Sequence, residues 1–205
     1  LLDVAGKALG VPAYQLLGGR FRDTIRIYAD CHAGDEPTPE SAAAKAKEAV
    51  GLGFDAVKFD IDEANDPNKL DRWNTSITHR ELARMVDMVA AVREAIGEDI
   101  DLAIDMHGQY DMSAAIRVAH ALEPYDLMWL EEPVPPENVD AMREVKRVAP
   151  MPICVGENLF LRWGFRDLLQ QQAADVIMPD LPKCGGLTEG KRIAEGEAFG
   201  EPGHG

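Results

Sequence analysis

Three acidic residues, each at the end of an apolar segment, are the first candidates for chemistry in this sequence. Asp105, Glu131 and Glu157 follow one another at intervals of 26 residues, which fits one strand, one crossover helix and their loops. Because parallel strands end on the same side, we expect these carboxylates to converge. Such charges repel unless a cation lies between them, and oxygen ligands favour a hard divalent ion, Mg²⁺ first. The spacing therefore predicts a magnesium site, although one acidic residue after a strand is more often a loop residue or a helix cap.

Strand-like and helix-like patterns alternate along the chain, which predicts parallel strands joined by right-handed crossovers. We expect strands at residues 24–29, 56–61, 101–107, 127–131, 153–157 and 176–179, and helices at residues 39–50, 79–96, 113–122, 139–148, 162–171 and 187–199. Residues 1–19 are expected to form a helix end and a turn. The long polar segment 62–78 is expected to be an active-site loop, because long loops in compact domains usually have a function.

The length of the chain limits how much of a barrel it can form. Six strand–helix units are visible in 205 residues, whereas a closed eight-unit α/β barrel typically needs about 250 residues. Residues 200–205 contain no apolar strand, and the sequence begins without Met. We therefore expect a partial chain that contains most, but not all, of a barrel.

The composition of the chain disfavours some classes of binding partner and favours one cellular compartment. The chain has 21 Lys and Arg against 36 Asp and Glu, a net charge of −15, which disfavours nucleic acid and anionic membranes as partners. An anionic substrate would need a local positive centre, such as a metal ion. The three cysteines are odd in number and have no paired spacing, which favours a reducing cytoplasm over a disulfide framework. We also expect no membrane-spanning segment and no signal peptide.

Several motifs together resemble one known family. They are residues 6–12 (GKALGVP), 14–19 (YQLLGG), 129–133 (WLEEP), 155–158 (VGEN), 178–180 (MPD) and 185–186 (GG). The chain resembles the mandelate racemase/muconate lactonizing enzyme family of the enolase superfamily from its first residue to about residue 199. The resemblance implies a TIM-like modified (β/α)₇β barrel with an α+β cap. Residues 1–23 would end the mostly missing cap, residues 24–199 would form the truncated barrel, and residues 200–205 would be a tail.

The resemblance also indicates which branch of the family this chain is most similar to. Its three metal ligands fall on the three carboxylates already selected by spacing, with Mg²⁺ as the cofactor. Racemases and cycloisomerases of the family usually carry Lys-x-Lys at the end of the second strand, where this chain has Lys58 and Asp60. Asp105 and His107 are similar to the Asp-x-His of galactonate and gluconate dehydratases, in which the His protonates the departing hydroxyl. Residues two apart on a strand share a face, so both side chains should point into the site.

The remaining candidates also come from the resemblance. Lys58 would bind the substrate carboxylate or stabilise the developing charge, and Asp60 and Asn158 would contact the substrate. Asp180 matches the acidic half of a His–Asp dyad whose His would be His204. Ordinary explanations stay open, because a strand-end Lys is often only solvated and an Asp often caps a turn.

The sequence therefore predicts a Mg²⁺-dependent dehydratase of small acid sugars (aldonates or aldarates), a hydro-lyase. A base would remove the proton α to the carboxylate, the metal would stabilise the enediolate, and His107 would expel the β-hydroxyl as water. Lys183 matches the base of the cycloisomerases, so a racemase or cycloisomerase is one alternative. A catalytically inactive, truncated metal-binding barrel is the other. The full-length form is expected to be a homo-oligomer.

Overall fold

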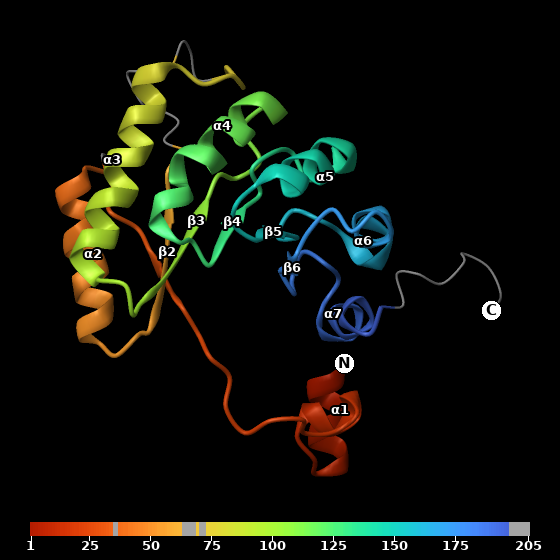
Figure 1. The fold of residues 1–205 in the computed structure, drawn as a ribbon. Helices are drawn as coiled ribbons and strands as arrows, with labels where there is room; N and C mark the ends of the chain where they lie inside the picture. The colour runs from red at the N-terminus through yellow and green to blue at the C-terminus, as the bar shows by residue number, and fades with distance from the viewer. Residues whose placement is uncertain (35–36, 63–68, 70–72, 197–205) are drawn as a thin grey trace.

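Six parallel strands form a single sheet in the computed structural model of the chain (Figure 1). The structure describes residues 1–34, 37–62, 69 and 73–196. The strands lie in the order of the sequence: β1 (Ala29–Cys31), β2 (Ala56–Asp60), β3 (Asp101–Asp105), β4 (Trp129–Glu131), β5 (Ile153–Val155) and β6 (Val176–Ile177). Each strand pairs in parallel with the next. The predicted alternation of strands and helices in an α/β fold is therefore confirmed.

Most helices lie along the outside of the curved sheet, whereas the N-terminal helix lies apart from the sheet (Figure 1). The helices are α1 (Leu2–Leu9), α2 (Pro39–Gly51), α3 (His79–Ile96), α4 (Met112–Leu122), α5 (Val139–Val148), α6 (Leu161–Gln170) and α7 (Leu187–Ala194), with short 3₁₀ helices η1 (Ala13–Leu17) and η2 (Glu123–Tyr125). Thr38 and Thr78 begin α2 and α3 with capping boxes, in which each Thr side chain accepts a hydrogen bond from a backbone N–H three residues later.

Alternation along the strands gives the sheet two different faces. Val57 and Phe59 of β2 and Ile104 of β3 belong to the buried core that the helices cover. The intervening residues, such as Lys58 and Asp105, point to the opposite face. The apolar face therefore fixes the sheet against the helices, and the other face presents charged groups.

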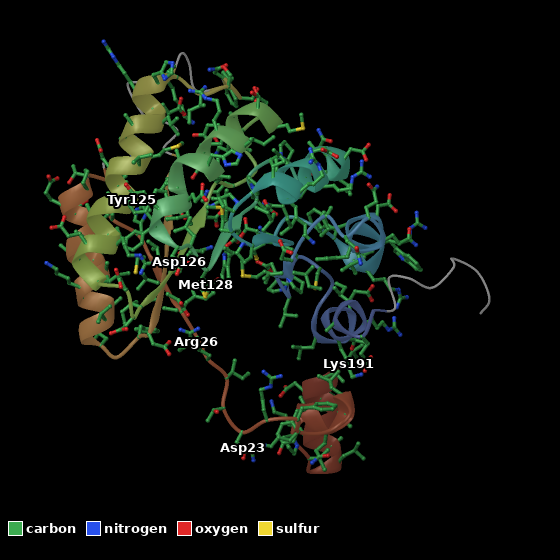
Figure 2. All side chains as sticks on the ribbon, viewed as in Figure 1. Asp23, Arg26, Tyr125, Asp126, Met128 and Lys191 are labelled. Carbon is green, nitrogen blue, oxygen red and sulfur yellow. The ribbon has the colours of Figure 1, made fainter. Side chains whose placement is uncertain are left out.

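The sheet is open within the part of the chain that the structure describes, because β1 and β6 lie at its two edges. An extended segment leads from η1 to β1, and α1 lies at the end of that segment, below α7 in Figure 1. Figure 2 shows Asp23 and Arg26 on this segment, and Lys191 on the side of α7 that faces α1. Arg26 forms ion pairs with Asp55 and Asp101 at 3.1 and 2.6 Å, which hold the segment against the ends of two strands.

The prediction of a strand at residues 24–29 was wrong, because β1 contains only Ala29–Cys31. Ala29 is paired with Val57, so residues before Tyr28 would lie opposite the turn that precedes β2, where no partner strand exists. Ile25 and Ile27, whose alternation suggested the strand, are 75 % and 63 % exposed. Apolar alternation therefore identified an extended segment, whereas strand pairing depends on the register with β2.

Several other boundaries also differ from the prediction. β3 ends at Asp105 and β5 at Val155, each two residues early, and β6 ends at Ile177. Pro179, two residues after the end of β6, has no N–H, so it cannot donate a hydrogen bond that would continue the strand pairing. The last helix ends at Ala194, and the predicted continuation through residues 197–199 lies outside the described residues.

The cysteines and the lengths of the helices can also be compared with the sequence expectations. The three cysteines, Cys31, Cys154 and Cys184, are buried and free. Among the described helices, none has the length and apolar character required to cross a bilayer.

Candidate active site

A buried lysine between two carboxylates lies at the centre of the charged face. Lys58 on β2 donates hydrogen bonds to Asp105 Oδ2 at 2.8 Å and to Glu131 Oε2 at 3.2 Å. The β-sheet register places the three strand ends side by side, and Asp105 and Glu131 are each only 1 % exposed. Burial alone would lower the pKa of Lys58, but the hydrogen bond and charge of Asp105, with the charge of Glu131, outweigh it and raise that pKa. The lysine therefore stays protonated and balances one of the two negative charges.

Glu131 retains one carboxylate oxygen that fits a cation. Its Oε2 accepts hydrogen bonds from Lys58 and from Trp129 Nε1 at 3.3 Å. Its Oε1 is buried and has no hydrogen-bond partner among the described residues. Burial, followed by the charge of Asp105, raises the pKa of Glu131 to about 7. A hard divalent ion would satisfy the free oxygen and remove the repulsion, so these groups fit Mg²⁺.

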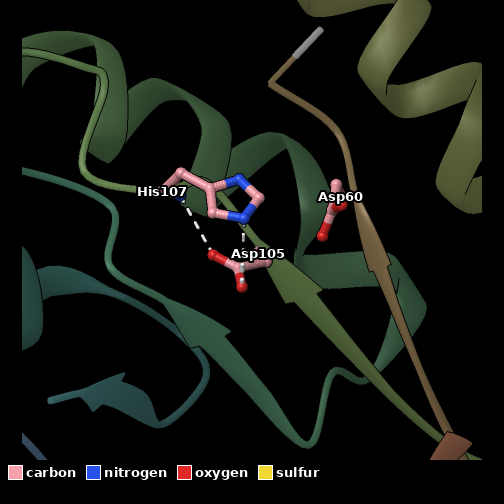
Figure 3. A group of neighbouring side chains, drawn as sticks. All are labelled: Asp60, Asp105 and His107. Atoms are coloured by element: carbon pink, nitrogen blue, oxygen red, sulfur yellow. Dashed lines mark hydrogen bonds and ion pairs between the residues drawn. The ribbon is translucent and has the colours of Figure 1, made fainter. Parts of the chain in front are cut away.

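His107 lies above Asp105 by a different route from the one predicted. β3 ends at Asp105, and His107 adopts a left-handed backbone conformation with φ 47°, so the two residues do not share a strand face. The turn nevertheless returns the ring over the strand end (Figure 3). The His107 N–H donates to Asp105 Oδ1 at 3.0 Å, and Nε2 lies 3.8 Å from Asp105 Oδ2. The predicted proximity is present, but a backbone turn produces it.

A second carboxylate holds the opposite edge of the His107 ring. Nδ1 of His107 lies 2.9 Å from Asp62 Oδ1, and this hydrogen bond raises the pKa of His107 to about 10. Asp60, at the end of β2, reaches toward the same ring (Figure 3), and burial raises its pKa. The imidazole is therefore protonated near neutral pH, which is the form that a general acid requires.

A cavity of about 200 Å³ opens beside this histidine. Its polar lining comes from His32, Asp60, Asp62, His107 and Gln109, which lie at or just after the carboxyl ends of β1, β2 and β3. The cavity offers room for a small molecule directly next to the imidazole. It lies at the carboxyl ends of the strands, where parallel α/β folds place their ligands.

Beyond β5, a second cluster surrounds an asparagine. Nδ2 of Asn158 donates to Glu132 Oε2 at 2.7 Å and to Glu157 Oε1 at 3.1 Å. The chain reaches this position through Gly156, whose φ is 149° and where a Cβ would lie 2.9 Å from the Met178 carbonyl oxygen. Only glycine fits this close approach between β5 and the segment after β6. Asn158 thereby orients Glu157 and is positioned at the mouth of the sheet.

The candidate base that the structure describes, Lys183, is less enclosed than Lys58. Lys183 is exposed, and its Nζ donates to Asn158 Oδ1 at 3.2 Å. Asp180 Oδ1 accepts the backbone N–H of Lys183 at 3.0 Å, which is the turn-capping role considered as the ordinary explanation. The predicted dyad partner of Asp180, His204, lies outside the described residues.

The three predicted metal ligands do not gather closely in the described part of the chain. The group of potential ligands whose atoms lie within 4.8 Å of one another is Asp60, Asp105 and His107. Asp105 and Glu131 instead meet at Lys58, and Glu157 is turned to Asn158. The assignment of Asp105, Glu131 and Glu157 as ligands stays a prediction, which their chemistry supports.

Sequence reasoning missed the part that Asp62 plays in this site. Asp62 was included only in the predicted loop 62–78, yet it continues the period of two that begins at Lys58 and Asp60. That period was the available signal. Lys69, from the same loop, lies 3.9 Å from Glu81 and 5.2 Å above the ring of Tyr110. Most of the loop lies outside the described residues.

The fold and the motifs define the class of protein: the chain belongs to the enolase C-terminal domain-like family, whose family model matches residues 41–201. A D-xylonate dehydratase of Haloferax volcanii is 46 % identical over 196 residues, covering 95 % of this chain and 47 % of that protein. A D-gluconate dehydratase of Thermoproteus tenax is 37 % identical over 200 residues, covering 97 % of this chain and 39 % of that protein.

Solved structures show the same relationship. The crystal structure of a mandelate racemase/muconate lactonizing enzyme-like protein from Rubrobacter xylanophilus superposes with a TM-score of 0.90 at 50 % identity, covering 95 % of this chain and 53 % of that one. A member of the enolase superfamily from Salmonella Typhimurium has a TM-score of 0.87 at 36 % identity, covering 96 % and 53 %. The chain thus spans about half the length of the proteins it matches, as expected for a partial chain.

Proposed function

We propose that this chain carries the catalytic core of a Mg²⁺-dependent dehydratase that acts on acid sugars. The observation that carries the proposal is the position of His107, whose ring lies beside Asp105, is held by Asp62, and forms part of the wall of a small cavity. The relatives named as dehydratases of D-xylonate and D-gluconate support this substrate class. The three free cysteines support a reducing cytoplasm as the place of action.

Asp105, Glu131 and Glu157 would hold the metal ion. When bound, Mg²⁺ would stabilise the negative charge that develops on the substrate carboxylate as the α-proton leaves. Lys58, protonated and buried at the same strand ends, would add a second positive charge for that carboxylate. Its present partners, Asp105 and Glu131, lie 2.8 and 3.2 Å away.

His107 would act as the general acid. Nε2 would transfer a proton to the β-hydroxyl as the carbon–oxygen bond breaks, so that water leaves and a 2-keto-3-deoxy acid forms after tautomerisation. Asp60 lies next to the ring and would accept hydrogen bonds from substrate hydroxyls. Asn158 would hold Glu157 in place, since its amide already donates to that carboxylate.

Lys183 is the candidate, among the residues that the structure describes, for the base that removes the α-proton. A lysine in this role would also suit a racemase or cycloisomerase, which is the alternative function. The Nζ of Lys183 reaches Asn158 at 3.2 Å at the mouth of the sheet. If Lys183 acts as the base and His107 is not needed to expel a hydroxyl, the reaction would be a racemisation or cycloisomerisation. That activity would exchange the proton α to the carboxylate with solvent without releasing water.

The test compares turnover with proton exchange. D-xylonate, D-gluconate and D-galactonate are incubated with the chain and Mg²⁺ in deuterium oxide, and both the keto-deoxy product and C2 deuterium are measured. We expect dehydration of at least one acid, a loss of about 100-fold or more in His107→Asn, and no change in His120→Asn, an exposed residue on α4. Exchange without dehydration would favour the racemase alternative. A rise in melting temperature with Mg²⁺ but no reaction would favour the inactive barrel.

A further inference from the structure

A buried carboxylate, Asp62, contacts the side of the His107 ring that does not face the proposed substrate. Asp62 lies two residues after the end of β2 and is 6 % exposed, although it belongs to a long polar segment. Its Oδ1 lies 2.9 Å from His107 Nδ1. A carboxylate in such a buried position is expensive unless it is paired, so this contact accounts for its burial.

The backbone around Asp62 is held as firmly as its side chain. The N–H of Ile61 donates to the Asp105 carbonyl oxygen at 3.2 Å, which extends the pairing of β2 and β3 past the last strand residue. Arg84 from α3 donates to the Ile61 carbonyl oxygen at 2.9 Å. The carboxylate is therefore presented to His107 by a fixed segment.

The contact decides which ring nitrogen faces the site. An ionised carboxylate only accepts hydrogen bonds, so Nδ1 of His107 carries a hydrogen and donates it to Asp62. Nε2 is then the atom directed toward Asp105 Oδ2, 3.8 Å away. The backbone N–H of His107 is fixed separately by Asp105 Oδ1 at 3.0 Å. Both ends of the residue are held, and Nε2 remains available to a ligand.

We propose that Asp62 is a positioning residue, which fixes the His107 ring through Nδ1 so that Nε2 is the nitrogen that serves the substrate. The inference rests on the proposed dehydratase function. Asp62 lines the cavity beside His107, but its carboxylate acts through the ring. Comparable carboxylate–histidine pairs orient imidazoles in other enzymes, and replacing the orienting carboxylate of a catalytic triad lowers kcat strongly.

The kinetic test uses Asp62→Ala in the chain with Mg²⁺ and the acid sugar that it dehydrates best. We expect kcat to fall about 100-fold while KM stays within about threefold, because the acid is misplaced but the substrate contacts remain. Asp62→Asn keeps an oxygen acceptor and should recover part of the loss. Asp167→Ala, an exposed residue on α6, is the matched control and should behave as the parent.

A spectroscopic measurement separates positioning from general destabilisation. In the chain labelled with ¹⁵N-histidine, we expect a slowly exchanging downfield Nδ1–H proton, assigned by its absence in His107→Asn and lost in Asp62→Ala. If Asp62→Ala shows no cooperative thermal transition, Asp62→Leu replaces it, because leucine is also branched at Cγ and has no acceptor. A folded variant with the parent's kcat, or with the resonance unchanged, overturns the inference. If the parent dehydrates no acid sugar, the proposed function fails, whereas the resonance still tests the Asp62–His107 contact.

Discussion

The ends of β2, β3 and β4 and the ends of β5 and β6 carry similar residue types in very different surroundings. Lys58, Asp105 and Glu131 are buried and contact one another directly. Glu157 and Asn158 are half-buried, and Lys183 is exposed. β3 and β4 have strands on both sides, whereas β6 is an edge of the sheet. Charges in the first region therefore interact strongly, and those in the second are screened by water.

The largest difference should appear when each region loses its lysine. Lys58→Met leaves two buried carboxylates without their counter-ion, and we expect the free energy of unfolding to fall by about 3–5 kcal/mol in metal-free protein. Lys183→Met should change it by less than about 0.5 kcal/mol, because its partners are open to water. Urea unfolding measures both values. Equal losses in the two variants would show that burial does not distinguish the regions.

The second prediction concerns pH. The folded-state pKa of Glu131 is raised from its usual range to about 7, so the folded protein binds this proton more tightly than the unfolded chain. The contribution of Glu131 to the free energy of unfolding is therefore most favourable at low pH and is lost as pH rises through about 7. Between pH 5 and pH 8, metal-free protein should lose about 2–3 kcal/mol of stability from this group. Urea unfolding of the parent and Glu131→Gln tests this, since the variant should lack that part of the pH dependence.

Two tyrosine hydroxyls, one buried and one half-buried, allow the effect of burial to be compared again. Tyr110 is fully buried, and its hydroxyl donates to Glu81 Oε1 at 2.9 Å, whereas the half-buried Tyr28 donates to the Met178 sulfur at 3.3 Å. Tyr110→Phe removes a bond to a buried carboxylate and should cost about 1.5–2 kcal/mol. Tyr28→Phe should cost less than about 0.5 kcal/mol, because a thioether is a weak acceptor. A larger loss in Tyr28→Phe would contradict the ranking.

Local patterns were enough to predict which acidic residues lie where the strands end, but not the contacts that these residues make. Asp105 and Glu131 were found because an apolar strand precedes each one. Lys58 was expected to face the substrate, yet it bridges residues 47 and 73 positions away, and only the sheet register decides that contact. His107 was placed correctly for the wrong reason, since the left-handed turn after β3 has no strand periodicity. Asp62 was missed because its role depends on that turn.

A smaller effect on stability should come from Asn158, where stability and metal binding can be measured separately. Its hydrogen bond to Glu157 is half-exposed, but its other partner, Glu132, is fully buried, so Asn158→Ala should cost about 1 kcal/mol. Metal binding should respond much more, because loss of a group that orients a ligand typically weakens affinity about 10- to 100-fold. Calorimetric titration with Mg²⁺ and urea unfolding of the same variant measure the two quantities. Unchanged Mg²⁺ affinity would remove Glu157 from the metal site and leave Asp105 and Glu131 as the described candidates.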